Sequence, residues 1–198
     1  MKILMTGFEP FGGETVNPSW EAVRGIRAVP DGTELVRLML PVSFRKAPEK
    51  LREAIRVERP DIVLCIGQAG GREAVTPERI AVNLKDASIA DNDGDMPSEE
   101  PIEKEGENAL FSTLPVKRIA EAIAQAGVPS AVSNTAGLYV CNTVLYEALF
   151  TASRNYPSMK AGFIHVPFLP EQAEGKNAPG LTLEEDIRAL EAALAVLV

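Results

Sequence analysis

The sequence is poor in the residues that build metal clusters and disulfide frameworks. Its 198 residues contain one histidine and two cysteines, Cys65 and Cys141, and neither cysteine belongs to a CxxC pair. Two isolated cysteines cannot form a disulfide framework, and they lack the spacing of a metal or redox site. We therefore expect no metal and no cofactor, and we expect the protein to occupy the reducing cytoplasm.

Positive charge and long apolar runs are also scarce. Lys and Arg total 20 against 28 Asp and Glu, which gives a net charge of -8, and no basic block interrupts this balance. Because a protein that tracks a phosphate backbone needs such a block, we expect no nucleic-acid partner. No run approaches the roughly 18 apolar residues of a membrane span, and the first residues, MKILMTGFEP, do not resemble a signal peptide. We expect no membrane contact.

Short apolar runs alternate with amphipathic helical patterns along the chain. The sequence predicts strands at 2–7, 34–42, 61–67, 130–136 and 160–167. It predicts helices at 17–29, 43–59, 115–127, 138–154 and 182–198, with Asn17 and Thr182 as N-caps. Continuous apolar strands between helices indicate a mostly parallel or mixed, twisted sheet that is covered on both faces. We therefore expect an α/β fold, a single-domain three-layer α/β/α sandwich over residues 1–198.

One acidic segment, at about 86–110 and reaching as far as residue 115, breaks this alternation. It is rich in proline and glycine and is long for a connection inside a compact domain. A solvated surface loop, a lid and a subunit contact are all compatible with it. Its DNDGD stretch is not a calcium loop, because a calcium-binding template that starts at Asp91 places Met96 where a turn glycine is needed.

The loops that follow the predicted strands are the places to look for a site, because ligands of open α/β sheets bind beyond the carboxyl ends of the strands. The first of these loops, at 6–13, reads TGFEPFGG. Its glycine spacing fits a phosphate-binding loop, but Glu14 and the preceding glycine occupy the positions of the required Lys and Ser or Thr. Phe8 and Phe11 serve either as anchors in the core or as walls for a ligand.

Two further exit loops contain polar residues with possible roles in a site. The loop at 67–83 places Gln68 directly after a strand and Glu78 beside Arg79. Glu78 is either half of a surface ion pair, the commoner case, or a partly buried carboxylate that orients another group. A single histidine is more often structural than catalytic, but His165 ends a predicted strand and is the only imidazole available as a general base near neutral pH.

The two cysteines have different predicted surroundings. Cys65 lies inside an apolar strand and is predicted to pack in the core. Cys141 lies in the stretch SNTAGLYVCN, where a predicted strand gives way to a helix, and the apolar spacing of that helix also favours core packing. Its place in the first helical turn, however, favours a thiolate and lowers the pKa of a thiol. Only a nearby histidine and carboxylate would decide for a nucleophile.

Several segments, in order along essentially the whole chain, resemble the pyroglutamyl peptidase type I family, cysteine peptidases also called pyrrolidone carboxyl peptidases. The segments are TGFEPFGG, NPSWEA, GQAGGR, ERIAVN, FSTLPVK, SNTAGLYVCN and HVPFLP. The resemblance implies a hydrolase that acts on peptides with an N-terminal pyroglutamate and cleaves the bond after it through a thioester. It also implies a homo-oligomer, commonly a homotetramer in this family.

The resemblance assigns roles to individual residues. The nucleophile, the general base and the acidic member of its catalytic triad are Cys141, His165 and Glu78. By the same resemblance, the substrate contacts are Phe8, Phe11, Gln68, Tyr139 and Val140.

Two alternatives remain beside this interpretation. A nucleoside phosphorylase, whose fold the family resembles, needs a cationic phosphate site, and the exit loops offer Arg72 and Arg79 but no cation in the first glycine turn. A small-molecule-binding relative without catalysis is the other alternative, and the presence of all three triad residues argues against it.

Overall fold

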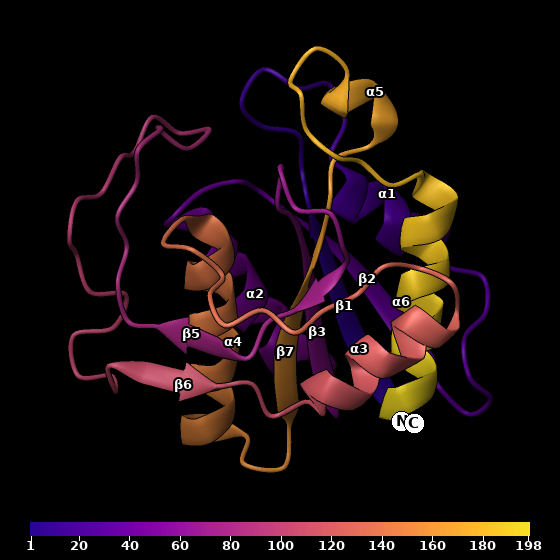
Figure 1. Ribbon diagram of the computed structural model, residues 1–198. Coiled ribbons are helices and arrows are strands. Elements are labelled where there is room, and N and C mark those ends of the chain that lie inside the picture. The colour runs from indigo at the N-terminus through magenta and orange to yellow at the C-terminus, as the bar shows by residue number, and fades with distance from the viewer.

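The computed structural model describes residues 1–198 and has three layers (Figure 1). The central sheet has five strands in the order β2-β1-β3-β7-β4. Its strands are β1 (Lys2–Phe8), β2 (Glu34–Leu40), β3 (Ile62–Gln68), β4 (Thr76–Pro77) and β7 (Lys160–Val166). The first four in spatial order are parallel, whereas β4 pairs antiparallel with β7. The predicted α/β fold with a mostly parallel, mixed sheet is confirmed.

Helices cover both faces of this sheet. One apolar cluster joins it to α2 (Lys46–Glu58) and α4 (Val140–Asn155). A second cluster joins the other face to α1 (Pro18–Gly25), α3 (Val116–Gln125) and α6 (Leu183–Leu197). The residues of β1 alternate between the clusters, since Leu4 belongs to the first and Ile3 to the second. Burial on both faces explains why the strands read as continuous apolar runs.

Local sequence signals set the beginnings of α1 and α6. Asn17 caps α1, because its side-chain oxygen accepts the Ser19 N–H at 3.1 Å, and Pro18 occupies the first helical position. Thr182 caps α6 in the same way and forms a capping box with Glu185. The predicted helix at 17–29 is too long, because α1 ends at Gly25.

The predicted strand at 130–136 is wrong. This segment runs parallel to residues 75–79, but instead of a strand it forms only two isolated bridges, which keep the same register. They join Val75 to Ser130 and Glu78 to Ser133. Backbone hydrogen bonds form on both sides of Pro77, from Ala131 N–H to Val75 C=O and from Ser133 N–H to Pro77 C=O. Pro77 itself has no N–H to donate, so the ladder is interrupted between the two bridges.

Four short elements were not predicted. These are β4, β5 (Ile80–Val82), β6 (Ala109–Phe111) and α5 (Pro170–Ala173). β5 and β6 pair as a second, two-stranded sheet, and the acidic segment at about 86–110 extends beyond it at the left of Figure 1. None of the helices combines the length and the apolar character that crossing a membrane requires.

Candidate active site

The strand order brings the predicted site residues to one edge of the sheet. The carboxyl ends of the parallel strands point to the side where α5 lies (Figure 1). On that side Gly67 of β3 is paired with His165 of β7, and α4 begins at Val140. A cavity of about 300 Å³ opens there. It is lined by seven of the eight predicted residues, which are Phe8, Phe11, Gln68, Tyr139, Val140, Cys141 and His165.

The eighth residue, Glu78, lies behind the histidine. Its Oε1 is 2.7 Å from His165 Nδ1, and the two side chains are 0% and 3% exposed. The short antiparallel strand creates this contact, since β4 pairs Thr76 with His165 and the Glu78 N–H donates to the Phe163 carbonyl at 2.9 Å. Glu78 is therefore a buried carboxylate bonded to the imidazole, and the alternative of a surface pair with Arg79 does not hold.

The buried pair holds one charge in the resting protein. Burial lowers the pKa of His165, although the hydrogen bond and charge of Glu78 oppose this, so the imidazole is neutral at neutral pH. Burial would raise the pKa of Glu78, but its hydrogen bond with His165 and the charge of Arg72 hold it below the usual value. With the carboxylate ionised, Nδ1 of His165 carries the proton and Nε2 is left as the basic nitrogen.

Cys141 lies in the first turn of α4 and lines the same cavity as His165. Burial, followed by the charge of Glu78, raises the pKa of its thiol to about 12. The helix start does favour the thiolate, because the backbone bond at Cys141 lowers the pKa, but burial outweighs this contribution in the protein without substrate. The resting cavity thus holds a neutral thiol beside a neutral imidazole.

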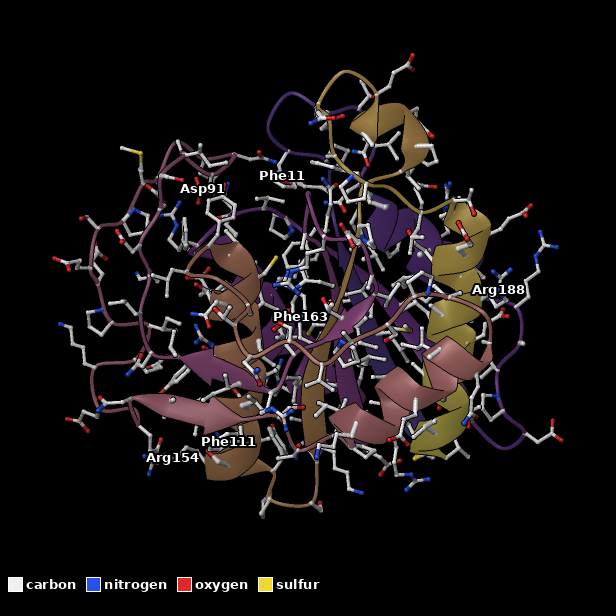
Figure 2. The ribbon with its side chains drawn as sticks, viewed as in Figure 1. Phe11, Asp91, Phe111, Arg154, Phe163 and Arg188 are labelled. Atoms are coloured by element: carbon white, nitrogen blue, oxygen red, sulfur yellow. The ribbon has the colours of Figure 1, made fainter.

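Gly67 leaves space for the Cys141 sulfur. A Cβ atom at Gly67 would lie 2.9 Å from Cys141 Sγ and 2.6 Å from Cζ of Phe163. Figure 2 shows Phe163 in the middle of the molecule, below Phe11, which lies toward the carboxyl ends of the strands. Glycine at this position therefore allows the thiol to reach the end of β3.

Aromatic rings form one wall of the cavity. The ring centroids of Phe11 and Tyr139 are 6.2 Å apart, and Phe44 packs edge-on against Tyr139 at 5.1 Å. Phe8 is 2% exposed and lies within the core as well as at the cavity. It is therefore both an anchor in the core and part of the cavity wall.

Sequence reasoning did not assign the remaining lining residues to a substrate site, although it named Asn17 as an N-cap and Arg72 as a possible phosphate ligand. These residues are Asn17, Val42, Ala69, Arg72, Thr135, Ala136 and Gly137. Arg72 is the one charged residue among them. Its Nη1 donates to Glu78 Oε1 at 2.5 Å and also to the Thr76 hydroxyl, and its Nη2 donates to the Thr135 carbonyl at 2.9 Å. The sequence signal that could have indicated Arg72 is its place after two glycines, in the same exit loop as Glu78.

Cys65 lies in the core behind Cys141, close enough that it contributes to raising the pKa of that thiol. It is fully buried in the core on β3 and does not line the cavity. Burial raises the pKa of its thiol to about 12. Its predicted role in core packing agrees with this position.

Comparison with known proteins supplies the family. The family model described as pyroglutamyl peptidase matches residues 1–198. The chain belongs to this family. A pyrrolidone-carboxylate peptidase of Levilactobacillus brevis is 51% identical over 199 residues, which cover 100% of this chain and 98% of that protein. The corresponding protein of Lactobacillus johnsonii is 49% identical, with 100% and 93% of the two chains covered.

Solved structures show the same fold. The crystal structure of pyroglutamyl peptidase I from Bacillus amyloliquefaciens has a TM-score of 0.95 and 48% identity, and the match covers 98% of this chain and 93% of that chain. A mutant pyrrolidone carboxyl peptidase from Pyrococcus furiosus has a TM-score of 0.94 and 40% identity, with 99% and 97% covered.

Membership of the pyroglutamyl peptidase family decides against the nucleoside phosphorylase alternative. The contacts of the two arginines agree with that decision. Arg72 is bonded to Glu78, and Arg79 donates to the Asn134 side chain at 2.7 Å. The charge of Arg72 is thus paired with a carboxylate, and Arg79 does not line the cavity.

Proposed function

We propose that this protein hydrolyses the amide bond that follows an N-terminal pyroglutamyl residue, with Cys141 as nucleophile, His165 as general base and Glu78 as the group that orients the imidazole. One observation carries the assignment of residues: a thiol and a hydrogen-bonded imidazole–carboxylate pair meet at one apolar cavity. Nucleophile, base and orienting group together form the constellation of cysteine-based acyl transfer.

The first half of the reaction forms the thioester. His165 Nε2 takes the proton of the Cys141 thiol as the sulfur attacks the carbonyl carbon of the scissile amide. The resulting imidazolium is stabilised by Glu78, whose Oε1 already accepts a hydrogen bond from Nδ1. The tetrahedral intermediate collapses when His165 returns the proton to the leaving nitrogen. The C–N bond breaks, the amine departs and the pyroglutamyl group remains on sulfur.

The second half restores the thiol. A water molecule loses a proton to His165 and attacks the thioester carbonyl, and the C–S bond breaks when the sulfur leaves with the proton from the imidazolium. Free pyroglutamate is released. The backbone N–H of Cys141 has no backbone acceptor and stands at the start of α4, so we assign it as one donor to the oxyanion.

The cavity has the character that a pyroglutamyl ring needs. The ring is a neutral lactam without an ammonium group, so a charged anchor would contribute little to its binding. Phe8, Phe11, Tyr139 and Val140 offer apolar surface, and Gln68 adds polar groups. This combination fits a flat, neutral ring that is bound by a few hydrogen bonds.

The experiment is hydrolysis of a pyroglutamyl amide by the wild type, Cys141→Ser and His165→Ala. We expect release of pyroglutamate by the wild type and a loss of at least about 10³-fold in kcat/KM for each variant. Prolyl and glutamyl amides serve as substrate controls, and circular dichroism checks the fold. Undiminished turnover by Cys141→Ser would overturn the mechanism, and binding without turnover by the wild type would favour the non-catalytic alternative.

Assembly and location complete the proposal. The resemblance to the family supports a homo-oligomer, a tetramer in particular, and light scattering coupled to gel filtration measures it. Both cysteines are free thiols, which fits a reducing compartment, and we propose the cytoplasm.

A further inference from the structure

Arg72 connects the buried carboxylate to the wall of the cavity. It lies between β3 and β4, and its side chain is 26% exposed. Its guanidinium and His165 bond the same oxygen of Glu78, Oε1, from two sides. The bond from its Nη2 to the Thr135 carbonyl reaches the segment Thr135–Gly137, which lines the cavity. A single side chain therefore contacts both the acid and the place where the substrate would lie.

The charges around His165 explain why a cation is needed at Arg72. The charged groups that act on its ring are Glu78, which precedes β5, and Arg72 from the loop before β4, and Cys141 from α4 lines the same cavity. In the resting protein the imidazole and the thiol are neutral, so Glu78 is a buried anion and Arg72 is the one cation bonded to it. A buried carboxylate without a cation would take up a proton or would draw one onto His165.

Resting on the proposed function, we propose that Arg72 is a positioning residue that keeps Glu78 charged while His165 stays neutral, and so sets the pH above which Cys141 reacts. The guanidinium stabilises the anion in the resting state and opposes a positive charge on the imidazole. Its bond to Thr135 holds the acid in a fixed position relative to the cavity. Arg72 makes this contribution through Glu78 and His165, without a role in bond making.

The pH dependence of two rates tests this proposal. One is kcat/KM for a pyroglutamyl amide, and the other is alkylation of Cys141 by iodoacetamide, located by mass spectrometry. The charge of Arg72 lowers the pKa of both His165 and Cys141. In Arg72→Gln we therefore expect the acid limb of both profiles to move to higher pH by about one unit. A purely structural role would lower the rates without moving these midpoints.

Two variants serve as matched controls. Arg72→Lys keeps the charge but loses the forked contact with Thr135, so we expect its midpoints to stay within about 0.3 unit of the wild type while kcat falls. Arg79→Gln removes the same charge from the residue next to Glu78, whose side chain bonds Asn134 instead, and we expect its profile to stay unchanged. If Arg72→Gln does not fold, Arg72→Met, which also removes the charge, takes its place, and the same upward shift of the midpoints is expected.

The outcomes separate the two proposals. An unchanged or lower midpoint in Arg72→Gln, an equal upward shift in Arg79→Gln, or a shift of a full unit in Arg72→Lys would overturn the role of Arg72. A wild type that cleaves no pyroglutamyl amide would overturn the proposed function instead. The alkylation profiles would then still test Arg72, because that reaction needs no substrate.

Discussion

Cys65 and Cys141 share a residue type and a pKa of about 12, which burial raises in both thiols, yet their surroundings differ. Cys65 is enclosed by the core between the sheet and α4, whereas Cys141 lines the cavity beside His165. The resting pKa therefore does not distinguish a packing residue from a nucleophile. The neighbouring base does, because His165 can take the proton while the sulfur attacks.

We expect Cys65→Ala to keep kcat/KM within about twofold of the wild type, since the residue does not line the cavity and takes no part in the bond between His165 and Glu78. The lost sulfur leaves a small void in the core, so the free energy of unfolding should fall by about 1–2 kcal/mol. Urea denaturation and the pyroglutamyl amide assay measure the two effects. Loss of activity in a folded variant would contradict the assignment of Cys65 to packing.

At the residue level, the sequence indicated the predicted site residues through short segments that carry them. Seven line one cavity and Glu78 lies directly behind it. Arg72 escaped that reasoning as a partner of Glu78, because an arginine six positions before a glutamate has no fixed geometry until β4 places both beside β7. Contacts of this kind depend on strand pairing, which residue types alone do not determine.

At the scale of elements, apolar periodicity predicted the long strands and helices but overestimated one strand. The segment at 130–136 has the composition of a strand, and its backbone follows the parallel register. The missing N–H lies in its neighbour, at Pro77, more than 50 positions earlier in the chain. The sequence of residues 130–136 does not show that the neighbouring segment lacks an N–H donor, so the strand could not be excluded from that sequence alone.

The segment Ala90–Asp93, within the long acidic loop, joins three elements around the cavity. The Tyr139 hydroxyl donates to the Ala90 carbonyl at 3.0 Å, and the Asn92 side chain donates to the Pro10 carbonyl at 3.0 Å. Asp91 accepts the N–H of Phe44 at 2.8 Å and is buried. Figure 2 shows Asp91 and Phe11 toward the same end of the molecule, beyond the carboxyl ends of the strands. The segment therefore braces the aromatic wall from outside.

We expect Asp91→Asn to weaken substrate binding more than catalysis. Besides Phe44, the Asp91 carboxylate accepts the N–H groups of Asp93 and Asp95, each at 2.9 Å. An amide cannot accept all three bonds, because its NH₂ group only donates. The aromatic wall should loosen, so that KM rises by about tenfold while kcat stays within about twofold.

Asp95→Ala is the matched control for this brace. The bonds between Asp91 and Asp95 use only the backbone of Asp95, which the substitution keeps. We expect its KM to equal that of the wild type. Steady-state kinetics on a pyroglutamyl amide measure both variants, and an unchanged KM in Asp91→Asn would show that the segment does not shape the cavity.

At the scale of the whole molecule, the excess of acidic residues lies mostly at the surface, but Asp186 is an exception. It is 0% exposed in the first turn of α6, and both of its carboxyl oxygens lack a hydrogen-bond partner. Burial, followed by the charge of Glu185, raises its pKa from 3.8 to about 8. The folded protein therefore holds this carboxyl group protonated at neutral pH, whereas the unfolded chain ionises it.

This difference links the folding stability to pH. Between pH 4 and pH 8 the folded state binds a proton at Asp186 that the unfolded state does not bind. The contribution of this group to the free energy of unfolding is therefore fully present below pH 4 and is lost as the pH rises toward 8, by up to about 1.4 kcal/mol per pH unit. We expect Asp186→Asn to remove that loss, so that the free energy of unfolding of the variant, relative to that of the wild type, rises steadily from pH 4 to pH 8. Urea unfolding at several pH values measures this difference. Asp31→Asn, which removes an exposed carboxylate, should run parallel to the wild type, and parallel curves for Asp186→Asn as well would mean that Asp186 ionises in the folded protein.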